Sequence, residues 1–238
     1  MDTSRIRAYL YLAFFVPLTF LFAASALVGT LLKSGGGIYA FHARLWARLA
    51  LLMAGVRVTV SGNEHLPAGP VIFMSNHQSS FDILALLAAM PRRIYWIAKK
   101  ELFDIPVFGT SMRRGGYIPL DRSDGRKALK SMDNAASIIR EGKSVVLFPE
   151  GTRSLSGELL PFKRGGFILA RKAGVPVVPI TINGSGRINP AGQIRLSRGD
   201  ISIVLHPPLA LPPDISKNEA ETWMMEQTRS TIVSALEH

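Results

Sequence analysis

The sequence contains no cysteine, and only 19% of its 238 residues are charged. Without cysteine, disulfide bonds, thiolate metal sites and cysteine nucleophiles are all excluded. The low content of charged residues is combined with 47% hydrophobic residues, whereas a disordered chain has many charged and few hydrophobic residues. The length suffices for one domain with a substantial core and a short appendage, but not for two large domains.

Acidic residues are scarce relative to basic ones. The chain has 28 Lys and Arg against 17 Asp and Glu, a net charge of +11. Ten basic and four acidic residues lie between Pro91 and Lys130, so this segment alone contributes +6. A basic and hydrophobic chain predicts an anionic partner at a membrane surface, with nucleic acid as the competing anion.

Charge is absent from Ala8 to Leu32, a run of 25 residues between Arg7 and Lys33. As a helix it would extend about 37 Å, enough to cross the hydrocarbon core of a bilayer. The run is compatible with a cleaved secretory signal, with a membrane span kinked at Pro17, or with an anchor in one leaflet. We favour a retained anchor, and basic residues on both sides leave its orientation open.

A second apolar helix is expected after the break at residues 34–37. Its apolar positions recur at helical spacing: Ile38, Phe41, Leu45, Leu49 and Leu52. Arg44 and Arg48 lie off this stripe, as expected for a helix that rests on anionic headgroups. The alternative is that the stripe packs on the protein core. Residues 1–55 are therefore predicted to form a two-helix membrane-docking segment, and residues 56–238 a globular domain.

From Val56 onward, short β-branched runs alternate with helical stretches. The expected strands are residues 56–60, 71–74, 94–97, 145–148, 175–182 and 201–205, and a strand-like stretch covers 116–122. The expected helices are residues 80–90, 124–140, 166–172 and 217–236, with a proline-rich linker at 207–213. This alternation predicts an α/β fold in which helices flank a mixed, largely parallel sheet.

A first motif, Asn-His-Gln-Ser-Ser-Phe-Asp, follows an expected strand and opens an expected helix. Strand ends are where α/β folds expose reactive groups. The carboxylate of Asp82 can accept from one ring nitrogen of His77 and leave the other as a base. The alternative is that Ser79 and Asp82 only cap the helix.

A second motif, Phe-Pro-Glu-Gly-Thr-Arg-Ser, follows the expected strand at 145–148. Its glycine allows close approach to the backbone, and the guanidinium of Arg153 suits a phosphate or a carboxylate. The alternative is a surface turn with an ion pair between Glu150 and Arg153. Between the two motifs, residues 116–122 end in Arg122.

The two motifs, the stretch ending in Arg122 and the later Val-Pro-Val-Val-Pro-Ile at 175–180 occur in a characteristic order and spacing. Together they resemble the four blocks of the glycerolipid acyltransferase family. The resemblance covers roughly residues 56–182, and the apolar N-terminal hairpin is similar to the membrane-docking segment of that family. It implies that residues 56–238 form an acyltransferase catalytic domain.

The resemblance also implies a role for each matching residue. His77 would be the general base that deprotonates the acceptor hydroxyl, and Asp82 would orient it. The implied acceptor-binding residues are Arg122 and Arg153 on the phosphate, helped by Lys100, with Glu150, Gly151 and Thr152 shaping the site. The block at 175–180 is tied to the acyl donor or to supporting structure.

The implied reaction moves an acyl chain from acyl-CoA or acyl-carrier protein to the sn-2 hydroxyl of 1-acylglycerol-3-phosphate (lysophosphatidic acid), giving phosphatidic acid. The thioester is a co-substrate, and no further cofactor is implied. A metal is not expected either, because the five histidines show no ligand spacing. The enzyme would lie on a membrane with its active site on the cytoplasmic side.

Two alternatives stay open at this point. The acceptor can be another lysolipid, such as lyso-ornithine lipid or lysophosphatidylcholine. Alternatively, the protein is a non-catalytic module that binds membranes or nucleic acid through the basic segment between Pro91 and Lys130. Nucleic acid is not the expected partner, because that segment lacks a platform of stacked aromatic residues.

Overall fold

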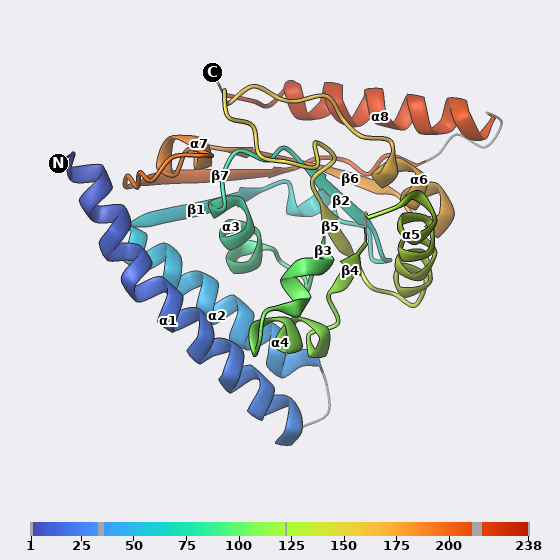
Figure 1. Cartoon of the computed structure of the whole chain (residues 1–238). Coiled ribbons are helices and arrows are strands. Elements are labelled where there is room, and N and C mark those ends of the chain that lie inside the picture. The colour runs from blue at the N-terminus through green and yellow to red at the C-terminus, as the bar shows by residue number, and fades with distance from the viewer. Residues whose placement is uncertain (1, 33–35, 122, 211–215, 238) are drawn as a thin grey trace.

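The structure is a computed structural model, and it describes residues 2–32, 36–121, 123–210 and 216–237. Within this part of the chain, a seven-stranded sheet has the order β1-β7-β6-β2-β5-β3-β4 (Figure 1). The strands are β1 (Val56–Ser61), β2 (Ile72–Ser75), β3 (Tyr95–Lys99), β4 (Ile118–Leu120), β5 (Val145–Leu147), β6 (Val177–Asn183) and β7 (Gly199–Leu205). All neighbouring strands pair in parallel except β6 and β7. The predicted mixed, largely parallel sheet is confirmed.

Helices cover both faces of the sheet (Figure 1). They are α1 (Thr3–Leu32), α2 (Gly36–Ala54), α3 (Phe81–Ala89), α4 (Phe108–Arg114), α5 (Gly125–Arg140), α6 (Gly165–Ala173), α7 (Ser185–Ile188) and α8 (Lys217–Val233), with 3₁₀ turns η1 (Asn63–His65) and η2 (Lys100–Asp104). One core joins α2 and α3 to the sheet, and a second joins α5 and α6 to its other face. Every helix and strand expected from the sequence is present, whereas α4, α7 and the two 3₁₀ turns were not predicted.

Strands β2 and β5 place the two sequence motifs beside each other. Every residue of β2 and of β6 is buried, which explains why these strands are mainly apolar rather than alternating between apolar and charged residues. Ile72 of β2 pairs in parallel with Val145 of β5. Because both strands run in the same direction, their carboxyl ends meet at the same edge of the sheet. The segments that begin at Asn76 and Phe148 therefore emerge together.

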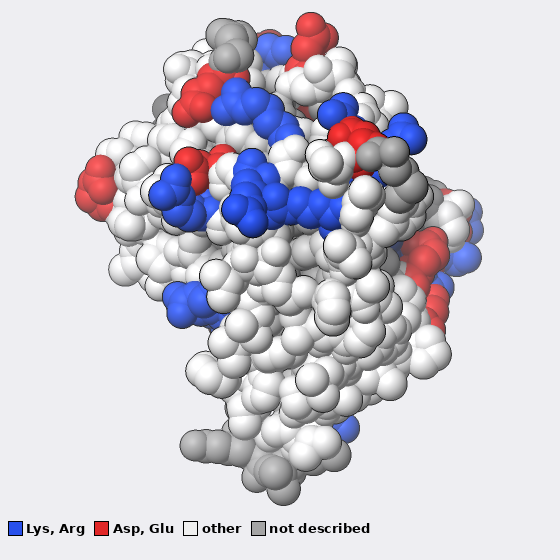
Figure 2. All heavy atoms as spheres, turned by 90° about the vertical axis from the view of Figure 1, so that its left-hand side faces the viewer, with Lys and Arg blue, Asp and Glu red and all other residues white. Residues whose placement is uncertain are grey.

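Helix α1 continues through Pro17 and is apolar over most of its length. Among the described residues it is the helix that is long and apolar enough to cross a bilayer: the candidate span Thr3–Thr30 covers 28 residues and contains an 18-residue window of mean hydropathy 2.1. Its exposed apolar side chains include Leu10, Phe14 and Leu21, which are 58%, 66% and 64% exposed. Figure 2 shows an almost uncharged lower half of this face, with Lys and Arg side chains in a band above it. This distribution fits a surface that contacts lipid below and headgroups above.

Helix α2 has two apolar faces. Ala47, Ala50 and Ala54 are fully buried on α3 and the sheet, whereas the predicted stripe points outward at Phe41 and Leu52. These two side chains are 63% and 74% exposed, so the alternative in which the stripe packs on the core is wrong for them. Small alanines allow the close approach of α2 to the domain and leave the larger side chains free.

Arg44 and Arg48, which were expected to rest on headgroups, also make contacts within the protein. Arg44 donates to the carbonyl oxygen of Met90 at 2.5 Å, and Arg48 donates to that of Ala88 at 3.4 Å. These carbonyls belong to the end of α3, where the last C=O groups of a helix have no partner within the helix. The two guanidinium groups thus fasten α2 to α3.

Four features expected from the sequence fall wholly or partly outside the described residues. Lys33, the first half of the glycine-rich break and Arg122 belong to this group, as do residues 211–213 of the expected linker. The beginning of that linker pairs with the sheet, because Leu209 forms an antiparallel bridge with Val177. The division of the chain at residue 55 stays a prediction.

Candidate active site

The loop between β2 and α3 carries His77 and is fixed at its start by Asn76. The side-chain amide of Asn76 donates to the carbonyl oxygen of Ile182 and accepts the N–H of the same residue, both at 2.8 Å. Ile182 lies on the neighbouring strand β6, so the amide completes the edge of the sheet where β2 ends. This role of Asn76 could not be expected from the sequence, because its partner lies 106 residues away.

His77 and Asp82 are in direct contact. The Nδ1 atom of His77 lies 2.8 Å from Oδ2 of Asp82, and this oxygen also accepts the N–H groups of Gln78 and Ser79 at 2.9 Å each. An oxygen that accepts two N–H donors indicates that Nδ1 carries the proton, which leaves Nε2 with a free lone pair. The capping alternative holds in part, because Oγ of Ser79 accepts the N–H of Phe81 at 3.2 Å, but the contact with Asp82 makes His77 more than a loop residue.

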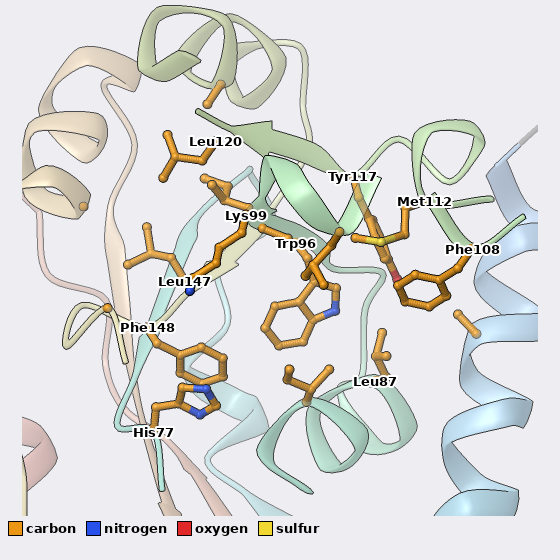
Figure 3. Close-up of a pocket in the computed structure, with 18 of the residues that line it drawn as sticks. His77, Leu87, Trp96, Lys99, Phe108, Met112, Tyr117, Leu120, Leu147 and Phe148 are labelled. Atoms are coloured by element: carbon orange, nitrogen blue, oxygen red, sulfur yellow. The ribbon is translucent and has the colours of Figure 1, made fainter. Parts of the chain in front are cut away.

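The imidazole ring is held on one face by Phe148. The two ring centroids are 3.7 Å apart and the planes differ by 6°, and Phe148 stacks in turn near Trp96 (Figure 3). The side chain of His77 is 13% exposed and that of Asp82 is 1% exposed. The ring is therefore fixed at the wall of the pocket rather than free in solvent, and its role as a base stays a prediction.

Glu150 supports the histidine loop from the second motif. One carboxylate oxygen accepts the N–H of His77 at 2.6 Å and the other accepts the N–H of Leu160 at 2.8 Å. Burial raises the pKa of Glu150 to about 7, although the two N–H bonds oppose that rise. The N–H of Ser154 donates to the carbonyl oxygen of His77 at 2.8 Å. The ion pair with Arg153, which was the alternative for this motif, is not formed.

Three cationic side chains line the same pocket: Lys99, Arg153 and Lys163. All three are exposed, and within the described part of the chain none of them forms an ion pair. Lys100, which was expected to help bind phosphate, instead pairs with Asp121 at 3.1 Å. Neither Lys99 nor Lys163 was expected from the sequence to bind the acceptor.

Gly151 and Thr152 form the turn beneath Lys163, and both line the pocket. Gly151 has a φ of +74°, a conformation that L side chains rarely adopt. A Cβ atom at this position would lie 3.0 Å from Nζ of Lys163. The glycine therefore allows the lysine to lie close over the turn.

The pocket is a cavity of about 620 Å³ with a mainly apolar lining. Figure 3 shows His77 and Phe148 at one edge, Leu120 and Leu147 on one side of Trp96, and Phe108, Met112 and Tyr117 on the other. Further walls come from residues of the two N-terminal helices, such as Ala23 and Trp46. A largely apolar cavity with a few polar groups at one edge suits a ligand that combines hydrocarbon with a charged group.

A histidine beside a buried aspartate, at the edge of an apolar cavity with free cations, agrees with the resemblance of the sequence motifs. The model of the family described as Acyltransferase matches residues 57–183, more than half of the chain. The chain belongs to the acyltransferase family. The matched residues run from β1 to the end of β6 and contain both motifs.

Acyltransferases from three kingdoms of life resemble this chain. A chloroplast 1-acyl-sn-glycerol-3-phosphate acyltransferase of Brassica napus is 41% identical over 71% of this chain and 49% of its own length. The enzyme of Pseudomonas aeruginosa with the same name is 33% identical, over 79% and 77% of the two chains. The human alpha enzyme is 37% identical, over 70% and 62%. The match spans about half the length of the plant relatives.

The fold of this acyltransferase is also found in a solved structure. The crystal structure of the 1-acyl-sn-glycerophosphate (LPA) acyltransferase PlsC from Thermotoga maritima matches with a TM-score of 0.81 at 25% sequence identity. The match covers 97% of this chain and 95% of that one, so it includes the N-terminal helices as well as the sheet.

Proposed function

We propose that this acyltransferase transfers an acyl chain from a thioester to the sn-2 hydroxyl of 1-acylglycerol-3-phosphate. The observation that carries the proposal is the imidazole of His77, held by Asp82 through Nδ1, beside an apolar cavity lined by three cations that form no ion pair among the described residues. The names of the relatives from Brassica napus and Pseudomonas aeruginosa support this acceptor. The product would be phosphatidic acid.

The chemistry requires a base more than an acid. Nε2 of His77 takes the proton of the sn-2 hydroxyl while the hydroxyl oxygen attacks the thioester carbonyl carbon. When the tetrahedral intermediate collapses, the C–S bond breaks, and the thiolate leaves and takes the proton back from His77. A positioned general base typically contributes about 10²–10⁴-fold to such a step. Asp82 keeps Nδ1 protonated and stabilises the imidazolium that forms in between.

The free cations favour a phosphate monoester as the headgroup. Arg153 and Lys163 border the pocket beside the catalytic loop, and the family resemblance adds Arg122. A phosphate monoester gains most from charge-assisted hydrogen bonds of this kind. Lysophosphatidylcholine would bring a fixed cation to the same site and lyso-ornithine lipid an ammonium group, so both are disfavoured on electrostatic grounds.

The membrane is the proposed source of the acceptor. The exposed apolar side chains of α1 and α2 suit an anchor, either across the bilayer or within one leaflet. The donor would come from water as acyl-CoA or acyl-carrier protein, which places the active site on the cytoplasmic side, where these thioesters are made.

The test is acyl transfer by the purified full chain in lipid vesicles, with each acceptor and each donor in turn. We expect turnover with lysophosphatidic acid to exceed that with lysophosphatidylcholine and lyso-ornithine lipid by at least tenfold. Equal or better turnover with either of these would contradict the proposed headgroup. Absence of turnover with every pair, together with salt-sensitive binding to vesicles or DNA, would favour the non-catalytic module.

A further inference from the structure

The segment between β3 and α4 exposes three aliphatic side chains in close succession. Leu102, Ile105 and Val107 are 40%, 37% and 38% exposed, and we call them the rim patch. Phe103, in the same segment, is only 1% exposed and holds it against the domain. Neither the family motifs nor the proposed mechanism uses the rim patch.

The backbone at Val107 has an unusual conformation. Its φ and ψ are 63° and −58°, and the N–H of Phe108 donates to the carbonyl oxygen of Pro106 at 2.6 Å. These values define a γ-turn with positive φ, which is rare and strained, and more so for a β-branched residue. Among the described residues, Val107 is the non-glycine residue with positive φ. The turn exposes Val107, while the next residue, Phe108, lines the cavity.

The rim patch lies beside both the cavity and the proposed anchor. Leu102 belongs to the rim patch and also lines the cavity, together with Phe108. Helix α4, which follows the γ-turn, packs against α1, and Figure 1 shows it next to the lower parts of α1 and α2. The apolar surface of the anchor therefore continues to the mouth of the cavity.

The charges around the rim patch suit lipid headgroups. Lys99 and Arg114 are exposed and form no ion pair within the described residues, while Arg113 pairs with Asp104 at 3.3 Å. Residues 99–114 contain four basic and two acidic side chains, so the segment has a net positive charge. Aliphatic side chains flanked by cations are typical of segments that enter the boundary between headgroups and acyl chains.

We propose that the rim patch is a second membrane contact, distinct from the two N-terminal helices, which enters the surface of an anionic bilayer. This inference rests on the proposed function, because it explains how a lysolipid reaches His77. With Leu102, Ile105 and Val107 in the lipid, the cavity opens directly to the acyl region. The acceptor can then move sideways into the cavity without its chain crossing water.

The absence of cysteine makes a direct test possible. Single variants Ile105→Cys, Leu21→Cys and Val233→Cys are labelled with an environment-sensitive fluorophore and mixed with vesicles of phosphatidylcholine and phosphatidic acid. Part of the phosphatidylcholine carries bromine on its acyl chains and quenches probes that enter the bilayer. Leu21 reports on the anchor, and Val233, which is 41% exposed on α8, is the matched control outside both surfaces.

We expect quenching at position 105 of at least half that at position 21, and none at position 233. A probe at 105 that stays unquenched while the probe at 21 is quenched would overturn the rim patch and leave the anchor and the chemistry intact. If neither probe is quenched, the rim patch is overturned together with the anchor. Turnover of a short-chain acceptor in solution reports separately on the proposed chemistry.

A functional measurement separates lipid from protein as the partner. Ile105→Glu should lower the ratio of turnover on bilayer-embedded lysophosphatidic acid to turnover on a short-chain soluble acceptor about tenfold, whereas Val233→Glu should not change it. Val107→Gly adopts positive φ without a Cβ clash and checks that the turn folds without the valine. A loss at Ile105→Glu that occurs with acyl-carrier protein but not with acyl-CoA would overturn the proposal in favour of a protein docking site.

Discussion

The imidazole of His77 donates from Nδ1 to a carboxylate oxygen of Asp82 that already accepts two backbone N–H groups. The orientation of the ring is thus set by the loop itself. We expect His77→Ala to lower turnover by about 10³-fold or more, because the change removes the proposed proton acceptor. Acyl transfer and vesicle binding are measured on the same preparation, and binding should not change. Near-normal turnover would contradict the mechanism.

Asp82→Asn tests orientation separately from basicity. The amide has the same shape, but it no longer carries the charge that favours the imidazolium, and its NH₂ group can meet the backbone donors of Gln78 and Ser79. We expect turnover to fall by roughly 10²–10⁴-fold with little change in acceptor KM. Circular dichroism checks the fold. A rise in KM at unchanged turnover would show that Asp82 acts on the substrate instead.

Glu150 was predicted to shape the acceptor site, but both of its oxygens are bonded to backbone N–H groups. Glu150→Gln turns one acceptor into a donor that faces an N–H group, which should displace the loop that carries His77. We expect turnover at pH 8 to fall about tenfold to a hundredfold, with acceptor KM changed less than threefold. A direct acceptor ligand would instead raise KM, and steady-state kinetics distinguish the two.

Because the pKa of Glu150 is raised, the effect of Glu150→Gln on turnover should depend on pH. As the pH falls through about 7, the wild-type carboxyl group takes up a proton and presents an O–H to a backbone N–H. The difference in turnover between wild type and Glu150→Gln should therefore shrink below that pH. Because the folded protein binds this proton more tightly than the unfolded chain, the group contributes less stability as pH rises from about 4.5 to about 7. Urea unfolding at pH 5 and pH 8 should show the wild type losing stability relative to the variant.

The unpaired cations predict a binding effect without a stability effect. Arg153→Ala and Lys163→Ala each remove a side chain that holds no ion pair in the described structure, so the free energy of unfolding should change by less than about 0.5 kcal/mol. Loss of a charge-assisted hydrogen bond of about 1.5–3 kcal/mol would raise KM for lysophosphatidic acid about 10-fold to 100-fold. Arg126→Ala, on the exposed side of α5, is the matched control. Unchanged KM in both variants would contradict the proposed headgroup contacts.

Much of the fold was predictable because buried strands have a recognisable composition, rich in β-branched and other apolar residues. The β-branched runs that begin at Val145 and Val177 do not alternate with charged residues, as an exposed strand would, and both are buried. The contact between His77 and Asp82 was also predictable, since four intervening residues let a side chain in the first helical turn reach back to the loop. Gly174 ends α6 in the left-handed conformation expected of a helix C-cap.

Other features depend on partners that are distant in the sequence. Nothing near Arg44 in the sequence indicates that the end of α3 needs a hydrogen-bond donor, so the sequence predicted only a headgroup contact for this residue. The role of Glu150 depends on the N–H of His77, which lies 73 residues earlier in the chain. The sequence does not distinguish Lys99 from Lys100 as a phosphate ligand. Lys100 forms an ion pair because Asp121 lies beside it in the folded chain. The γ-turn at Val107 goes against the preference of valine and could not be inferred from it.

The proposed role of α1 as a membrane anchor is better tested by point substitutions than by deletion of the helix. Removal of residues 1–33 would weaken membrane recovery, but it would also remove Tyr11 and Phe15, whose rings lie 5.7 Å from Phe81 and 5.6 Å from Trp46. The domain would then be damaged as well as detached. Phe14 and Leu21 are the better targets, because they are 66% and 64% exposed and therefore contribute little to the core.

We expect the double variant Phe14→Asp with Leu21→Asp to leave the domain folded and to move at least half of the protein from the membrane fraction to the soluble fraction. Two carboxylates in the apolar face would cost about 2.5–3.5 kcal/mol each at the centre of a bilayer, and less in one leaflet. Turnover on a short-chain soluble acceptor should be retained, since neither residue lines the cavity. A matched change on α8, Val233→Asp, should leave the distribution unchanged. Full membrane recovery of the double variant would exclude α1 as the anchor, while the proposal for His77 would stand.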